Sequence, residues 1–299
     1  MVLQLGWLAS LSCIGCSERS EVVATVLSAP GTADAASVAP TPPRFAPPVL
    51  VSPLSDDRSI DEDPTFTGDL LELFFMSTRA GNKDIWTSLR ASAADAWGAP
   101  SLVAELSSTA NDWSPCVSLD GLRIWLASER AGGPGQIYLS TRASRSGAWG
   151  TPSLVSALSG DNVDFAPALD ATETVLFFSS NRTGSAGYDL YESTRANSGA
   201  TWGAPTLIAG LNSADDEYDP FVAQGGLVVF FTSMRSGAGD IYWSSRGSTS
   251  EAFLPPVLLT DVDSAEYDSD STLSQDLSYM MFSSTRTQNA EIYETHLLQ

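Results

Sequence analysis

The sequence predicts an all-β fold: a five-bladed β-propeller of four-stranded antiparallel blades. One set of Ser-x-Arg motifs recurs in five copies spaced by about 51 residues, with its arginines at Arg79, Arg130, Arg182, Arg235 and Arg286. Each interval carries four strand-like runs rich in β-branched and aromatic residues, separated by Gly and Pro. Four short strands in a repeat of this length are typical of one propeller blade. The runs lack a 3.6-residue periodicity, which excludes helical repeats.

The four runs follow a fixed order in each repeat. The first begins after an acidic residue, as in residues 112–115 (Asp-Trp-Ser-Pro), and ends at a turn such as residues 119–121 (Leu-Asp-Gly). The second is almost wholly apolar, as in residues 175–178 (Val-Leu-Phe-Phe), which predicts burial on both faces. The third begins at motifs such as residues 189–191 (Asp-Leu-Tyr), and the fourth follows Trp-Gly-x-Pro, as in residues 97–100.

The two ends of the chain are expected to build one blade together. The fifth repeat stops at Gln299, after its third strand. Its missing fourth strand is present at the front, where residues 45–50 (Phe-Ala-Pro-Pro-Val-Leu) match residues 253–258 (Phe-Leu-Pro-Pro-Val-Leu). Pairing the two ends would close the ring and remove an exposed sheet edge. The repeats fill residues 44–299 and leave no room for a sixth blade.

The charge of the chain restricts its partners. It has 36 acidic and 15 basic residues, a net charge of −21, which disfavours nucleic acid and anionic lipid and favours cations or basic partners. Lys83 is the single lysine, and His296 is the single histidine. A histidine this close to the chain end excludes a Ser-His-Asp triad and a His-rich zinc site.

The N-terminal residues 1–16 form a short apolar run that ends in Gly15-Cys16 and is too short to span a membrane. This segment resembles a bacterial lipoprotein signal, which implies lipidation of Cys16. The alternative is a disordered hydrophobic leader. Residues 17–43 are rich in Ala, Ser, Thr and Pro and are predicted to be a disordered tether. We therefore expect a cell-envelope protein, either a periplasmic or outer-membrane lipoprotein or a secreted one, with the lipid anchor as its only membrane contact.

The repeat also resembles a known family. Asp-x-x-Pro, a Ser-Leu-Asp-Gly turn, an apolar strand, Ser-x-Arg, a Gly-rich loop and Asp-Ile-Tyr are similar to the WD40-like (PD40) propeller repeat found in TolB. The resemblance covers residues 45–299 and implies the fold. It implies little about function, because such repeats serve many roles. The chain lacks the separate α/β domain of TolB and is one blade shorter, so a Tol–Pal role is not expected.

Two sets of arginines recur in the repeats. The Ser-x-Arg arginines (Arg79, Arg130, Arg182, Arg235 and Arg286) face acidic loops, and we expect bidentate carboxylate pairs that hold neighbouring blades in register. The third-strand arginines (Arg90, Arg142, Arg195 and Arg246) are placed at the opposite face, near Trp97, Trp149 and Trp202, where guanidinium–indole stacking is expected. In the fifth blade Leu297 replaces the arginine and Phe45 replaces the tryptophan, as loss of a stacked pair predicts.

Seventeen of the 36 acidic residues fall in the five loops that lead into first strands. The densest of these loops makes Asp261, Asp263, Asp268 and Asp270 candidate Ca²⁺ ligands, because carboxylate oxygens suit this ion. Solvated acidic loops are the favoured alternative, so a cofactor is not required, and Ca²⁺ is the one candidate.

Aromatic residues at the entrance of the first strands are the best candidates for ligand contacts. These are Trp113, Phe165, Tyr218 and Tyr267, with the neighbouring acids Asp112, Asp164, Asp219 and Asp268. Rings at a channel mouth can stack on sugars or peptides, while packing between blades is the favoured alternative. Glu62 takes the place of the aromatic residue in blade one.

The sequence favours a monomeric, non-catalytic binding or scaffold module whose acidic face meets a protein, a carbohydrate or a cation. The alternative is a carbohydrate-active or Ca²⁺-dependent enzyme with its site at the central channel. A glycoside hydrolase needs two carboxylates in unlike environments. Only Asp270 stands out as a non-repeating carboxylate on a first strand, so no catalytic residue is assigned.

Overall fold

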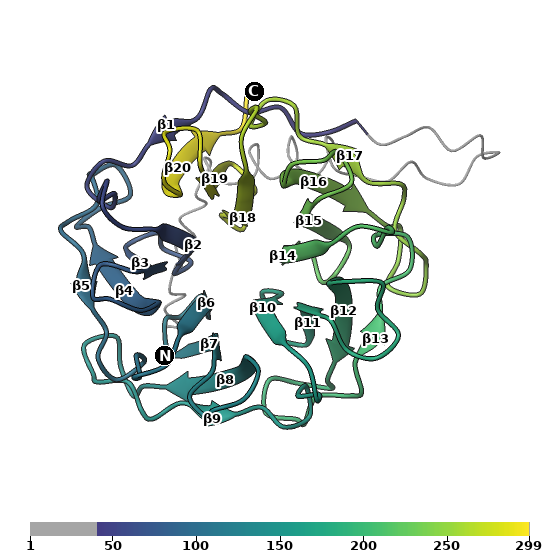
Figure 1. The fold of residues 1–299 in the computed structure, drawn as a ribbon, viewed down its shortest axis with the longest axis horizontal. Helices are drawn as coiled ribbons and strands as arrows, with labels where there is room; N and C mark the ends of the chain where they lie inside the picture. The colour runs from purple at the N-terminus through teal and green to yellow at the C-terminus, as the bar shows by residue number, and fades with distance from the viewer. Residues whose placement is uncertain (1–40, 299) are drawn as a thin grey trace, which may run out of the picture.

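The computed structural model describes residues 41–298 of the 299-residue chain, and it is a ring of five four-stranded antiparallel sheets (Figure 1). Blade one consists of β2 (Asp61–Phe66), β3 (Glu72–Ser77), β4 (Asp84–Leu89) and β5 (Ser101–Leu102). Blade two consists of β6 (Asp112–Val117), β7 (Arg123–Ser128), β8 (Gln136–Thr141) and β9 (Ser153–Leu154). Blade three consists of β10 (Asp164–Leu169), β11 (Val175–Ser180), β12 (Asp189–Thr194) and β13 (Thr206–Leu207). Blade four is β14 (Glu217–Ala223), β15 (Val228–Ser233), β16 (Asp240–Ser245) and β17 (Val257–Leu258). The predicted five-bladed propeller is confirmed.

Blade five joins the two ends of the described chain. It contains β18 (Asp268–Leu273), β19 (Tyr279–Ser284), β20 (Glu291–His296) and, as its outermost strand, β1 (Val49–Leu50). Val49 lies opposite Glu294 and Leu50 opposite Tyr293, and a further bridge joins Phe45 to Leu297. The N-terminal strand therefore closes the ring, as the matching Pro-Pro-Val-Leu segments predict. The signal segment with Cys16, and most of the tether, lie outside the described residues.

The apolar second strands are buried on both faces because each one separates two cores. On β11, Phe177 packs between blades three and four, whereas Phe178 packs between blades two and three, and both side chains have no exposed surface. Five such clusters, one between each pair of adjacent blades, form the interior of the described chain. In residues 41–298 we find no helix long and apolar enough to cross a membrane.

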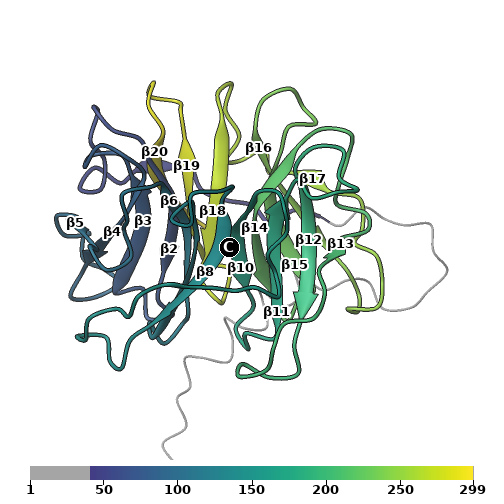
Figure 2. The same cartoon turned by 60° about the horizontal axis from the view of Figure 1, so that its bottom comes forward.

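The innermost strands β2, β6, β10, β14 and β18 line the centre of the ring, and the loops gather at its two ends (Figures 1 and 2). Each of these strands has a register shift two residues after its start, which is a β-bulge. The bulged residue has a positive φ in every blade: 58° at Asp63, 45° at Ser114, 49° at Ala166, 52° at Asp219 and 53° at Asp270. The bulge turns this position toward the channel, which makes it the main determinant of what the channel contains.

The Ser-x-Arg arginines differ in detail from the expected bidentate pairs between blades. Each uses one Nη2 to contact an acid of its own blade, as Arg182 does with Asp164 at 2.5 Å. The same nitrogen donates to a carbonyl of the segment that connects two blades, here Leu158 at 2.7 Å, and Nε donates to Ser180. The ion pair therefore fixes the connection between blades through a backbone carbonyl.

Bidentate pairs between blades exist at the opposite face, where the third-strand arginines lie. Arg142 of blade two binds both carboxylate oxygens of Glu72 of blade one, and Arg246 of blade four binds both of Glu192. The same guanidinium groups stack on aromatic rings. The distances from Cζ to the ring centroid are 4.1 Å for Arg90 on Trp97, 4.3 Å for Arg142 on Trp149, 4.1 Å for Arg195 on Trp202 and 4.5 Å for Arg246 on Phe253.

Candidate ligand-binding site

A cavity of about 300 Å³ opens at the end of the channel that carries the Ser-x-Arg loops. We call it the mouth cavity. Its walls combine aromatic rings, carboxylates and one ammonium group, from Glu62, Asp63, Lys83, Trp113, Ser114, Val163, Phe165, Tyr188, Tyr218, Asp219, Tyr267, Ser269 and Asp270. All five blades contribute to it, because the entrance of each first strand and the residue before each third strand converge at this end.

Five aromatic side chains, all partly exposed, line the mouth cavity: Trp113, Phe165, Tyr188, Tyr218 and Tyr267. Three of them form a cluster, with ring centroids 5.3 Å apart for Phe165 and Tyr188, 6.4 Å for Phe165 and Tyr218, and 6.3 Å for Tyr188 and Tyr218. The Lys83 ammonium lies 6.0 Å from the centroid of Trp113. The cavity therefore offers both ring faces and charged groups to a ligand.

Sequence reasoning missed Lys83 and Tyr188. Both stand immediately before a third strand, where the other blades carry Gly135, Gly239 and Ala290. This position alternates between small and large residues, and it holds the only lysine of the chain. This irregularity is the signal in the sequence that could have identified Lys83 and Tyr188 as site residues. A residue needed only for packing would have a similar size in every blade.

Tyr267 reaches the mouth cavity from a different position than the other predicted aromatics. By strand register, Trp113, Phe165 and Tyr218 each lie opposite the fifth residue of a second strand, and in blade five the residue at this position is Ser269. Tyr267 lies two positions earlier, where a Cβ on Gly239 of blade four would come within 2.2 Å of its ring. Two blades therefore lack an aromatic residue at the expected position: blade one has Glu62 there, and blade five has Ser269.

Three carboxylates meet at the floor of the mouth cavity. Asp63, Asp219 and Asp270 each place a carboxylate oxygen within 4.8 Å of the others. We call them the channel triad. They occupy the bulged position of blades one, four and five, where the other two blades have Ser114 and Ala166. The expectation that Asp270 alone is a non-repeating first-strand carboxylate is therefore wrong, because Asp63 and Asp219 share its position.

Glu62, Asp63 and Asp219 are held in an environment that disfavours their charge. Burial, followed by repulsion from Asp270, raises the pKa of Glu62 to about 7. The same two causes raise the pKa of Asp63 and of Asp219 well above the usual range. In residues 41–298, no Arg or Lys lies within ion-pair distance of any of these four acids. The mouth cavity therefore gathers four acids around one basic residue, Lys83, which makes no ion pair with any of them.

The other predicted acidic contacts are placed away from the mouth cavity. Asp112, Asp164 and Asp268 have no exposed surface and accept from Arg130, Arg182 and Arg286 at 2.6, 2.5 and 2.6 Å. They stand two residues before the bulged position, on the other side of the register shift. Of the four acids proposed as ligand contacts, Asp219 is the one that lines the cavity.

The structure does not bring the four predicted Ca²⁺ ligands together. Asp261 accepts from Arg44 at 2.5 Å, and Asp268 from Arg286. Asp270 belongs to the channel triad, and exposed Asp263 lies in a separate group with Asp240 and Asp268. The close spacing of these four acids in the sequence therefore does not predict a shared ion. The side chains of the acids on the strand that follows the loop point in different directions.

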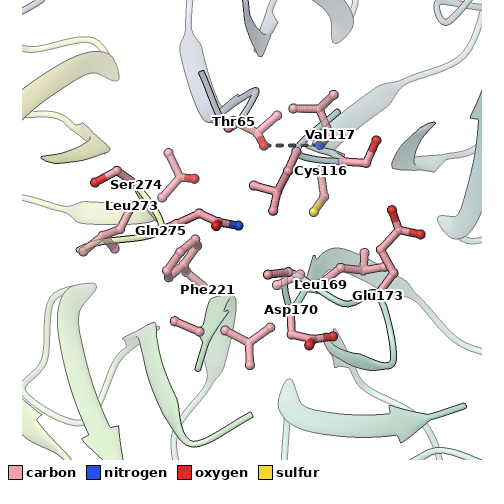
Figure 3. A pocket seen from close by; sticks show the side chains of 18 of the residues that line it. Thr65, Cys116, Val117, Leu169, Asp170, Glu173, Phe221, Leu273, Ser274 and Gln275 are labelled. Atoms are coloured by element: carbon pink, nitrogen blue, oxygen red, sulfur yellow. Dashed lines mark hydrogen bonds between the residues drawn. The ribbon is translucent and has the colours of Figure 1, made fainter. Parts of the chain in front are cut away.

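A second cavity, of about 260 Å³, occupies the opposite end of the channel (Figure 3). Its polar groups are mostly used within the fold: the Asp170 carboxylate accepts from the backbone of Thr174 and Val175, and Glu173 pairs with Arg123. Burial raises the pKa of the Cys116 thiol to about 12, so it stays protonated and is a poor nucleophile. This end of the channel is lined largely by apolar side chains, including Phe221 and Leu169, and few of its polar groups are free to bind a ligand.

No protein-family model matches the chain, and no curated protein sequence matches it. Solved structures do. A structure titled as TolB from Agrobacterium tumefaciens is 17% identical with a TM-score of 0.51, over 79% of this chain and 76% of that chain. An α-L-arabinofuranosidase from Podospora anserina, solved in complex with cellotriose, is 12% identical with a TM-score of 0.59, over 86% and 97%.

An endo-arabinase from Bacteroides thetaiotaomicron is 15% identical with a TM-score of 0.58, over 80% of this chain and 95% of that chain. At these identities the likeness shows the fold alone. The fold is shared with TolB and with glycoside-hydrolase propellers, which have different activities, so function has to be argued from the mouth cavity.

Proposed function

We propose that this protein is a non-catalytic binding module that takes a carbohydrate at the mouth cavity. The observation that carries the proposal is the convergence of five partly exposed aromatic rings with Glu62, Asp219, Asp270 and Lys83 in one cavity of about 300 Å³. Aromatic faces stack on the C–H faces of sugar rings, while carboxylates and an ammonium group hydrogen-bond their hydroxyls.

The aromatic cluster favours recognition over simple packing between blades. Packing would require the same aromatic residue at the same register in each blade, whereas these rings come from three different positions and two blades lack the expected one. The arabinofuranosidase solved in complex with cellotriose has the same fold, which supports a sugar ligand at a five-bladed ring.

Glycoside hydrolysis is the second candidate function. Glu62, with a pKa raised to about 7, would carry a proton at neutral pH as a general acid must. The triad oxygens lie within 4.8 Å of one another, which is too close for an inverting enzyme, whose two carboxyl groups are about 6.5–9.5 Å apart, but is near the about 5–5.5 Å of a retaining enzyme. We favour binding without turnover because Asp63, Asp219 and Asp270 occupy equivalent positions, whereas a hydrolase needs two carboxylates in unlike environments.

The test is a glycan array followed by calorimetry on the best ligand. Trp113→Ala and Tyr218→Ala should each weaken binding by about tenfold, the size of one lost stacking contact. Phe221→Ala is the matched control, because this aromatic residue lines the cavity at the opposite end. Equal affinity in all three variants would reject the mouth cavity as the site. Release of reducing sugar by the wild type, abolished by Glu62→Gln, would replace the proposal with the hydrolase.

We further propose that the module is exported and lipid-anchored through Cys16, which lies outside the described residues, and that it works as a monomer. The apolar run that ends in Gly15-Cys16 supports the anchor. Metabolic labelling with a fatty-acid analogue should label the wild type and not Cys16→Ser, and the variant should leave the membrane fraction. An unlabelled wild type found with soluble protein would support the alternative of an unmodified leader.

A further inference from the structure

We propose that the channel triad, Asp63, Asp219 and Asp270, binds a calcium ion on the axis of the ring, with the Ser271 hydroxyl beside it and water completing the coordination shell. This ion site differs from the acidic loop that the sequence suggested. It shares Asp219 and Asp270 with the proposed sugar site, so its tests are made without glycan.

The triad has the span that one calcium ion requires. Calcium takes six to eight oxygen ligands at about 2.3–2.6 Å, so two ligands on opposite sides of the ion are about 4.8 Å apart. The three carboxylate oxygens lie within that distance of one another. Three carboxylates from blades one, four and five would provide a strong field of hard oxygen ligands at a point where, within residues 41–298, no Arg or Lys lies within ion-pair distance.

The protein already orients the triad through hydrogen bonds rather than ion pairs. Ser114 donates to Asp63 from its backbone N–H at 2.9 Å and from its hydroxyl at 3.1 Å, and the Ser269 hydroxyl donates to Asp270 at 2.8 Å. The backbone N–H groups of Asp63 and Asp219 donate to hydroxyls of the preceding blades, Ser283 and Ser179, both at 3.2 Å. These contacts fix the side chains on the channel wall and leave several oxygen lone pairs directed into the channel.

Ser271 is the independent observation that points to a ligand. Its side chain is 5% exposed, and its Oγ has no hydrogen-bond partner among the described residues. Ser271 and the three triad residues line the same cavity of about 60 Å³. The equivalent residue is a proline in all four other blades, Pro64, Pro115, Pro167 and Pro220, so blade five alone places a hydroxyl there. A buried hydroxyl without a partner is costly unless a ligand satisfies it.

The surroundings select calcium over softer ions. Cys116 lines the same small cavity, but its pKa of about 12 keeps it a thiol, so it does not offer a thiolate to zinc or copper. The mouth cavity on one side and the small cavity on the other leave room for water ligands. Magnesium would demand near-ideal octahedral geometry at 2.0–2.1 Å, whereas calcium accepts the irregular ligand arrangement that three bulged strands and one hydroxyl provide.

Terbium luminescence tests the site directly, because Trp113, Tyr218 and Tyr267 lie beside the triad and can transfer excitation to a bound Tb³⁺. We expect saturable sensitised emission from the full chain, displaced by Ca²⁺, and a rise of several degrees in melting temperature with about 1 mM Ca²⁺. Asp219→Asn and Asp270→Asn should each weaken Ca²⁺ affinity about tenfold or more. Asp263→Asn is the matched control, since Asp263 belongs to the other acidic group.

Ser271→Pro separates the metal site from the fold. This change copies the residue of the other four blades, retains the triad and should weaken Ca²⁺ binding severalfold while the apo protein keeps its melting temperature. Wild type without saturable emission or thermal shift up to about 10 mM Ca²⁺ would overturn the proposal. So would wild-type affinity in Asp219→Asn and Asp270→Asn, or a loss confined to Asp263→Asn. Because no glycan is present, failure here leaves the proposed sugar binding standing, and the reverse also holds.

Discussion

Arg182 donates from Nη2 to Oδ1 of Asp164 across 2.5 Å, and the Asp164 side chain has no exposed surface. The same geometry recurs in each of the five blades, with Glu217 in place of Asp in blade four. It is therefore a structural element of the blade rather than a ligand site.

Arg182→Ala should lower the free energy of unfolding by about 3 kcal/mol, because it leaves a buried carboxylate without its partner. Urea denaturation measures the change. Arg58→Ala is the control, since this arginine is highly exposed and should cost almost nothing. Glycan and Ca²⁺ affinity should stay unchanged in a folded Arg182→Ala sample, and loss of binding with full stability would contradict the structural role.

Phe45→Ala should weaken closure of the ring. Phe45 is 2% exposed and packs with Trp243 and Tyr293 in the core between blades four and five. Removing a buried aromatic ring costs about 3–5 kcal/mol. Val49→Ala, in the exposed part of the same closing segment, should change stability by less than about 1 kcal/mol. Equal effects of the two changes would argue against a closing role for residues 45–50.

Stability without metal should fall as pH rises through neutrality. Burial and Asp270 raise the pKa of Glu62 from 4.5 to about 7, so its contribution is fully present below about 4.5 and is lost as pH rises through 7. Urea denaturation in chelator from pH 5 to 8 should show this loss, and Glu62→Gln should remove on the order of 2 kcal/mol of the dependence. An identical pH profile in the variant would show that Glu62 is ionised throughout.

Tyr188→Ala should weaken glycan binding without cost to the fold. Blade five carries Ala290 at the equivalent position, so the backbone accepts a small side chain there. The variant removes a ring that contacts both Phe165 and Tyr218 in the mouth cavity. Calorimetry should give an affinity about five- to tenfold lower. A melting temperature more than a few degrees below wild type would mean that Tyr188 serves packing instead.

Much of the architecture follows from local patterns that repeat. The apolar run at Val175 predicts a strand buried on two faces, and Phe177 and Phe178 do face two different cores. The Pro-Pro-Val-Leu match predicts the closing strand β1, which pairs with β20. These inferences succeed because strand periodicity and turn residues act over a few positions. The pattern also recurs in five copies, so an irregular residue in one copy does not obscure it.

The candidate site could not be derived in the same way. Asp61 and Asp63 stand two residues apart on β2, a spacing that places both on one face of a regular strand. The bulge between Glu62 and Thr65 changes the direction of the chain, so that Asp61 is buried under Arg79 whereas Asp63 faces the channel. The same shift separates Asp268, paired with Arg286, from Asp270, and it is why the sequence grouped these two as ligands of one ion.

By itself, then, the sequence determined the number of blades, the order of strands in each and the way the ends join, because each depends on short-range patterns. Only the tertiary structure decided which acids are neutralised and which are left together. Asp63, Asp219 and Asp270 are up to 207 residues apart in the chain and meet only because the ring brings equivalent bulges to one axis. Within residues 41–298, their lack of an ion pair and the unpaired hydroxyl of Ser271 are consequences of that convergence, as are the rings of the mouth cavity.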